Sequence, residues 1–184
     1  MTHTSTPKPS LNFASALAAQ FLYRLEEKRL LMLVQRACVL IAGAGLGLYA
    51  WGEGRTAIAA LLLPLALTLV GGRLNVYLFA FAYHLAVLRG ADDFIGQWFD
   101  SASIGILAWL TFGVVGAIPW TVAWWVNPNR PWTRGASATA GFLLSLLPWF
   151  AVLQGGHPIY GWGFALQGWG WFGIALALAF TWGM

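Results

Sequence analysis

Apolar residues of the chain run in six long blocks, separated by short stretches of polar residues or glycine. The blocks extend roughly over 31–51, 56–70, 74–88, 104–126, 136–153 and 164–183. Apolar runs of this kind are typical of membrane helices, and none of them alternates as a half-buried strand does. We therefore predict an all-α fold: a polytopic membrane helical bundle with about six membrane segments.

The second and third blocks are short for helices that cross a bilayer. Each holds about 15 residues, which span only about 22 Å at about 1.5 Å per residue, whereas a crossing takes about 20 residues. Three arrangements stay open for these short or kinked helices. They thin the bilayer, extend into their loops, or form a re-entrant pair joined by Gly71-Gly72-Arg73.

A different pattern precedes the blocks. Residues 1–9 are polar and contain proline, which predicts a disordered tail. Over 10–30, apolar residues recur with helical spacing on one face: Ala14, Leu17, Ala18, Phe21, Leu22 and Leu25. This pattern predicts an amphipathic helix at the membrane interface, followed by a membrane helical domain over 31–184.

Composition supports a membrane protein. Hydrophobic residues make up 59% of the chain, charged residues 9%, and the mean hydropathy is +0.69, whereas about a quarter of the residues of a soluble domain are charged. No Lys, Arg, Asp or Glu follows Arg134. A cleaved signal peptide over Lys28 to Trp51 is the rival interpretation, and the five further apolar blocks count against it.

The charges also predict orientation and partners. With six segments, the basic loops fall on the side of the N-terminus, so the positive-inside rule predicts that both termini lie in the cytoplasm. The formal net charge of +4 is explained by basic residues at the ends of apolar runs. We therefore expect membrane lipid as the partner, and no direct contact with nucleic acid.

The stretch Gly168-Trp169-Gly170-Trp171-Phe172-Gly173 formally satisfies the dinucleotide motif GxGxxG. That motif needs a preceding strand and an acidic residue about 20 positions later, and neither is present in the sequence. Tryptophan favours the bilayer interface. We therefore predict an aromatic belt of Trp162, Trp169 and Trp171 on the non-cytoplasmic side, and no cofactor.

Three ionisable residues are candidates for function. His84 lies inside the third block, where ionisable residues are functional candidates by default, and Arg89 follows about one turn later. His157 stands in the last loop before Pro158. The competing interpretations are an interfacial imidazole for His84 and an ordinary loop imidazole for His157.

The three aspartates of the loop over 89–103, Asp92, Asp93 and Asp100, match no calcium loop. We expect a solvated loop in which Asp100 or Ser101 caps the following helix.

The positions of glycine and proline also predict how the helices pack and bend. Gly43 and Gly47 have the GxxxG spacing that permits close helix contact. Three prolines inside the blocks, Pro64, Pro119 and Pro148, predict kinks one turn earlier.

Catalytic machinery is missing from the sequence. There is no GxSxG or HExxH motif, the three glutamates lie at or before Glu53, and the one cysteine is Cys38. We predict no catalytic, cofactor-binding or metal-binding residue, and no enzyme activity for this chain alone. The candidates for a functional role are His84, Arg89, His157, Trp169 and Trp171.

Two stretches, FAFAYHLAVLRGADDFIGQWF (79–99) and LLSLLPWFAVLQGGHPIYGWGFALQGWGWFGIAL (143–176), carry a family resemblance. With the order of apolar blocks, they resemble the membrane half of TraB-type conjugal transfer proteins, over about 37–183. The matching motifs are Tyr83 to Gly90, Pro148 to Phe150, His157-Pro158 and Gly168 to Gly173. Gln167 departs from the family pattern, which has proline there.

The resemblance implies an integral inner-membrane component of a conjugative DNA-transfer system, whose partners are other membrane proteins of that system. TraB-type proteins are distantly similar to apolipoprotein N-acyltransferases, whose nitrilase-like domain carries a Glu-Lys-Cys triad. This sequence stops where such a domain is expected to begin. An anchor or assembly role is the first hypothesis, the lipid-binding half of a split or truncated N-acyltransferase the second, and a small transporter or channel the third.

Overall fold

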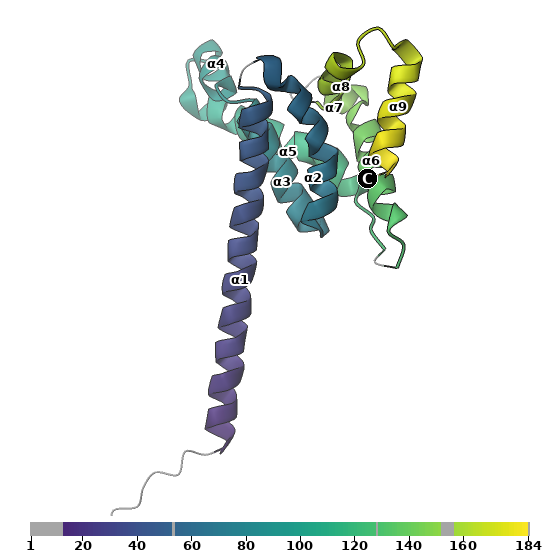
Figure 1. Cartoon of the computed structure of the whole chain (residues 1–184). Helices are drawn as coiled ribbons and strands as arrows, with labels where there is room; N and C mark the ends of the chain where they lie inside the picture. Colours follow the sequence, from purple (N-terminus) through teal and green to yellow (C-terminus); the bar gives the residue numbers. More distant parts are fainter. Residues whose placement is uncertain (1–12, 53, 128, 152–156, 184) are drawn as a thin grey trace, which may run out of the picture. The chain divides into compact units, whose positions relative to one another are not determined.

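The protein is helical in the computed structural model, which describes residues 13–52, 54–127, 129–151 and 157–183 (Figure 1). The elements in chain order are α1 (Phe13–Ala50), the 3-10 helix η1 (Gly54–Leu61), α2 (Leu62–Val70), α3 (Arg73–Val87), α4 (Ala91–Trp98), α5 (Ala102–Ala123), α6 (Trp132–Ser145), α7 (Pro148–Ala151), α8 (Ile159–Ala165) and α9 (Gly170–Gly183). The predicted all-α class is confirmed. The tail over 1–9 lies outside the described residues.

The chain forms two compact units, the first ending at Gln35 and the second beginning at Arg36. The helix predicted over 10–30 and the first apolar block belong to one continuous helix, α1. All contacts described below lie within the second unit.

Two helical stretches are long and apolar enough to cross a membrane, Tyr23–Ala50 and Ala102–Ala123. A third candidate exists if α3 and α4, which meet at a bend of 62°, form one span. The expected six segments are therefore not supported; two or three candidate spans are. The reason is length: α2, α3, α6 and α9 have 9, 15, 14 and 14 residues. Backbone breaks shorten two of the blocks, the fifth between Ser145 and Pro148 and the last between Ala165 and Gly170.

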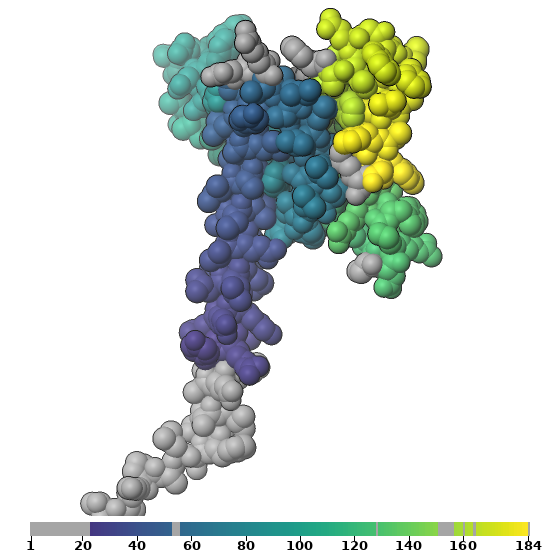
Figure 2. Space-filling model, viewed as in Figure 1, coloured from purple at the N-terminus to yellow at the C-terminus, as the bar shows by residue number. Residues whose placement is uncertain are grey.

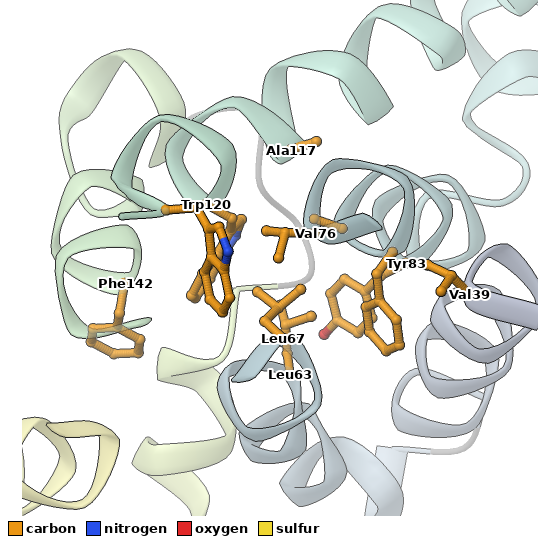
Figure 3. Close-up of a cluster of buried hydrophobic side chains, with 11 residues drawn as sticks. Val39, Leu63, Leu67, Val76, Tyr83, Ala117, Trp120 and Phe142 are labelled. Carbon is orange, nitrogen blue, oxygen red and sulfur yellow. The ribbon is translucent and has the colours of Figure 1, made fainter. Parts of the chain in front are cut away.

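The core of the second unit is formed where α3 and α5 meet their neighbours. Figure 3 shows Trp120 of α5 and Tyr83 of α3 on either side of Leu67 of α2, with Phe142 of α6 beyond the indole. The side chains of Tyr83, Leu67 and Trp120 are at most 1% exposed. Because lipid is as apolar as these side chains, close van der Waals packing is what favours such contacts inside a bilayer.

Glycines allow several helices to approach closely. A Cβ at Gly43 would overlap the carbonyl oxygen of Phe79, and one at Gly47 would lie 2.6 Å from the carbonyl oxygen of Tyr83. The close helix contact predicted from the GxxxG spacing is thus confirmed, between α1 and α3. Gly135 of α6 plays the same part against the backbone of Trp182 in α9, and Figure 2 shows α9, in yellow, lying against α6.

The ends of the helices follow local chemistry. Ser101 caps α5, because its hydroxyl oxygen accepts the backbone N–H of Ile104 at 3.4 Å, as one of the two predicted caps would. Pro119 lies inside α5, which continues through it. Pro148 instead begins α7 after α6 has ended, so the kink predicted near Leu144 is a break.

Candidate functional site

His157 is buried between the loop before α8 and helix α6. Its side chain is 3% exposed, and its ring lies 5.1 Å from the ring of Phe142, centroid to centroid. His157 is therefore part of the packed interior, which does not fit the competing interpretation of an ordinary loop imidazole.

Two hydrogen bonds fix the tautomer of His157. The backbone N–H of Ile159 donates to Nδ1 at 3.0 Å, so Nδ1 carries the lone pair. Nε2 then carries the proton and donates it to the hydroxyl oxygen of Ser145, at 2.5 Å. The Ser145 hydroxyl in turn donates to the carbonyl oxygen of Phe142 at 2.7 Å. We call this chain of bonds, from Ile159 through His157 and Ser145 to Phe142, the His157 latch.

The polarity of the His157 latch decides its chemistry. A serine nucleophile must donate its proton to a histidine that accepts it, whereas here the histidine donates and the serine proton is already held by a backbone carbonyl. Burial is the main cause that lowers the pKa of His157 to about 4, and the second cause is the repulsion that a proton on His157 would meet from a protonated His84. The imidazole is therefore neutral near pH 7, and the latch joins the start of α8 to α6.

His84 is fully buried in α3. Its Nδ1–H donates to the carbonyl oxygen of Ala80, one turn earlier, at 2.7 Å. The ring rests on Gly116 of α5, where an added Cβ would lie 2.5 Å from Cγ of the imidazole. Nε2 is buried, and no hydrogen-bond partner for it exists among the described residues. The imidazole therefore packs α3 against α5 and leaves one acceptor unpaired.

Arg89 lies apart from this interior. Its side chain is exposed, and its guanidinium reaches the carbonyl oxygen of Trp51 at 3.5 Å. It thus ties the end of α3 to the end of α1. The structure brings His84 and His157 near one another and leaves Arg89 at the surface.

Two glycines of the GxGxxG stretch form a turn. Gly168 and Gly170 have φ angles of +85° and +52°, a region that side chains with a Cβ rarely occupy. They reverse the chain between α8 and α9, where Trp169 is 52% and Trp171 86% exposed. The indoles of these two residues are thus free to form the predicted belt.

Trp162, the third residue of the predicted belt, is instead half-buried on α8. Its ring meets Phe180 edge to face, with the centroids 5.4 Å apart. It borders two apolar cavities, one of about 310 Å³ against α6 and α9, and one of about 620 Å³ against η1, α2 and α9. The indole N–H is buried and finds no acceptor among the described residues. Trp162 therefore separates two spaces shaped for apolar groups.

Sequence reasoning missed Ser145 as the partner of His157 and Gly116 as the partner of His84. Ser145 and Gly116 lie in apolar blocks far from the histidines they touch, so no local pattern relates them.

The three aspartates gather around one shallow space. Asp92, Asp93 and Asp100 line a cavity of about 360 Å³ beside the start of α5. Among the residues the structure describes, no group of three or more His, Cys, Asp or Glu side chains is arranged to hold a metal ion.

The fold and these contacts define a class: an apolar helical protein with two or three candidate membrane spans, whose buried polar side chains join helices. Compared with models of protein families, with curated protein sequences and with solved structures, the chain matches none.

Proposed function

We propose that the chain is an integral inner-membrane component of a conjugative DNA-transfer system, with an anchor or assembly role. One observation favours a structural role over a catalytic one. Two of the residues behind the resemblance to TraB-type proteins hold helices in place: His157 forms the His157 latch, and Gly90, with φ of +83°, is the N-cap of α4. Such contacts give a rigid body to which other membrane proteins of the system bind.

The proposed arrangement is multi-pass, with a cytoplasmic N-terminus. Charge supports it, because Arg73, Arg130 and Arg134 gather where α2, α5 and α6 have their loops, while Asp92, Asp93 and Asp100 lie around α4. Reporter fusions after Trp51, Arg89, Arg134 and Gly156 test the orientation. A cytoplasmic signal at Arg89 would contradict it.

The transfer role is tested by deleting the gene and counting recipients that acquire the plasmid or element. We expect transfer to be lost, and to return with the wild-type gene and with Gly45→Ala. Gly47→Ala, which adds a methyl group at the contact of α1 with α3, should restore it poorly. Unchanged transfer after deletion would refute the proposal.

The two apolar cavities beside Trp162 favour a second candidate, the lipid-binding membrane half of a split N-acyltransferase. Cavities of about 310 and 620 Å³ are of the size that takes apolar ligands, and the unpaired indole N–H offers a donor to an ester carbonyl. A neighbouring reading frame that encodes a nitrilase-like Glu-Lys-Cys set would support this candidate. Its absence would count against it.

A further inference from the structure

Three exposed tryptophans from distant parts of the second unit form one stack. The ring of Trp132, at the start of α6, lies 6.3 Å from that of Trp125 at an interplanar angle of 81°, and 6.2 Å from that of Trp182 in α9 at 16°. The three side chains are 62%, 46% and 52% exposed, in the order Trp125, Trp132 and Trp182. Large indoles left this exposed and mutually fixed favour the interfacial layer of a membrane.

Two hydroxyl side chains of α6 form hydrogen bonds with the backbone beside this stack. The Ser137 hydroxyl accepts the backbone N–H of Trp125 at 2.9 Å and donates to its carbonyl oxygen at 2.7 Å. The Thr133 hydroxyl oxygen accepts the N–H of Asn127 at 3.0 Å and donates to the carbonyl oxygen of Arg130 at 2.7 Å. These bonds join the backbone of Trp125, Asn127 and Arg130 to the side chains of α6.

Two arginines beside these bonds, Arg130 before α6 and Arg134 in its first turn, lack a counter-charge among the described residues. Arg130 and Arg134 are exposed, and among the described residues neither side chain has a hydrogen-bond or ion-pair partner. Arg73 lies alongside, its guanidinium donating to the carbonyl oxygen of Trp124 at 2.9 Å. No Asp or Glu follows Asp100 in the sequence, so α6, α9 and the loop before α6 contribute no acid to this surface.

We propose that Arg130 and Arg134, beside the stack of Trp125, Trp132 and Trp182, form a binding surface for the headgroup of an anionic phospholipid. The guanidinium groups match phosphate oxygens in shape and charge. The indoles lie below the phosphate, at the level of the glycerol and upper acyl chains. This surface is independent of the proposed transfer function and of the cavities beside Trp162.

The test uses the full chain in phosphatidylcholine vesicles that contain a minor fraction of phosphatidylglycerol with a photoactivatable group near its headgroup. After irradiation, mass spectrometry locates the labelled peptides. We expect labelling to concentrate on the peptides that contain Trp125 to Arg134 and Trp182. In the double variant Arg130→Gln, Arg134→Gln it should fall about fivefold for each arginine removed, the effect of one basic residue near an anionic surface.

The matched control is Arg89→Gln, which removes an exposed arginine at the other end of α3 and should leave this labelling unchanged. A photoactivatable phosphatidylcholine should label the surface far more weakly. Equal labelling by the zwitterionic lipid, or equal labelling of the double variant, would overturn the proposal. Inorganic phosphate should reduce labelling no more than chloride of the same ionic strength; a stronger reduction would indicate a free-phosphate site and would also overturn it.

Discussion

The contact between α1 and α3 can be tested with three glycines of one helix. Gly43 and Gly47 face the backbone of α3, whereas Gly45, between them, has no atom within 4 Å of the position a Cβ would take. Replacing each glycine by alanine changes the same chemical group in the same helix. The three variants therefore differ only in what the new methyl group meets.

The expected magnitudes come from two opposing effects. In a helix interior, alanine is more favourable than glycine by about 1 kcal/mol, so Gly45→Ala should stabilise the protein by up to that amount. At Gly47 the methyl carbon would lie 2.6 Å from the carbonyl oxygen of Tyr83 and 3.0 Å from Cβ of Ala86. A backbone atom has no rotamer with which to move away, and overpacking of this kind costs about 1–3 kcal/mol.

The observable is the difference between the variants. We expect Gly43→Ala and Gly47→Ala to be less stable than Gly45→Ala by about 1–3 kcal/mol. Equilibrium unfolding in mixed micelles of increasing SDS content, followed by the loss of helix circular dichroism, measures it. If Gly47→Ala unfolds at the same SDS content as Gly45→Ala, then α1 does not pack on α3 through this face, and the argument is wrong.

Two further predictions concern the buried histidines. The folded protein holds the pKa of His157 at about 4, below its ordinary value of 6.5, so the unfolded chain binds more protons between these values. The contribution of His157 to stability should therefore fall by about 3 kcal/mol as the pH drops from about 6.5 to about 4. SDS midpoints measured against pH should show a smaller fall in His157→Asn than in the wild type. An identical fall would contradict the latch. Gly116→Ala should lower the free energy of unfolding by about 1–3 kcal/mol, because the new methyl group overpacks against the His84 ring. Most of that loss should vanish in the His84→Ala background. Strictly additive effects in this double-mutant cycle would show that the two side chains do not touch.

The sequence predicted the class of fold because composition and length report on it directly. The GxxxG spacing and the Ser101 cap were also readable, since each depends on residues a few positions apart. The number of spans was not readable. An apolar block shows the same hydropathy whether or not its backbone is interrupted, and Gly168, Gly170 and Pro148 interrupt two of the six.

The candidate site shows a different limit. His84 and His157 were identifiable, because a histidine in an apolar environment is unusual at any position. The role of each histidine depends on a distant partner. For His157 the partner is Ser145, 12 residues away, and for His84 it is Gly116 on another helix. Neither relation leaves a periodic trace in the sequence.

Whether His157 donates or accepts a proton decides between two interpretations of its contact with Ser145: a catalytic pair and a structural contact. By distance alone, Ser145 and His157 could be a serine nucleophile and its histidine base, and the sequence gives no reason to reject that interpretation. The backbone N–H of Ile159 does reject it, because it donates to Nδ1 and so leaves the only ring proton on Nε2. Activating Ser145 would require moving that proton to Nδ1, where it would face the N–H of Ile159 with no acceptor between them. Because an unpaired buried donor costs about 1–3 kcal/mol, the surrounding fold keeps His157 as a donor, and the pair joins α8 to α6 as a structural contact.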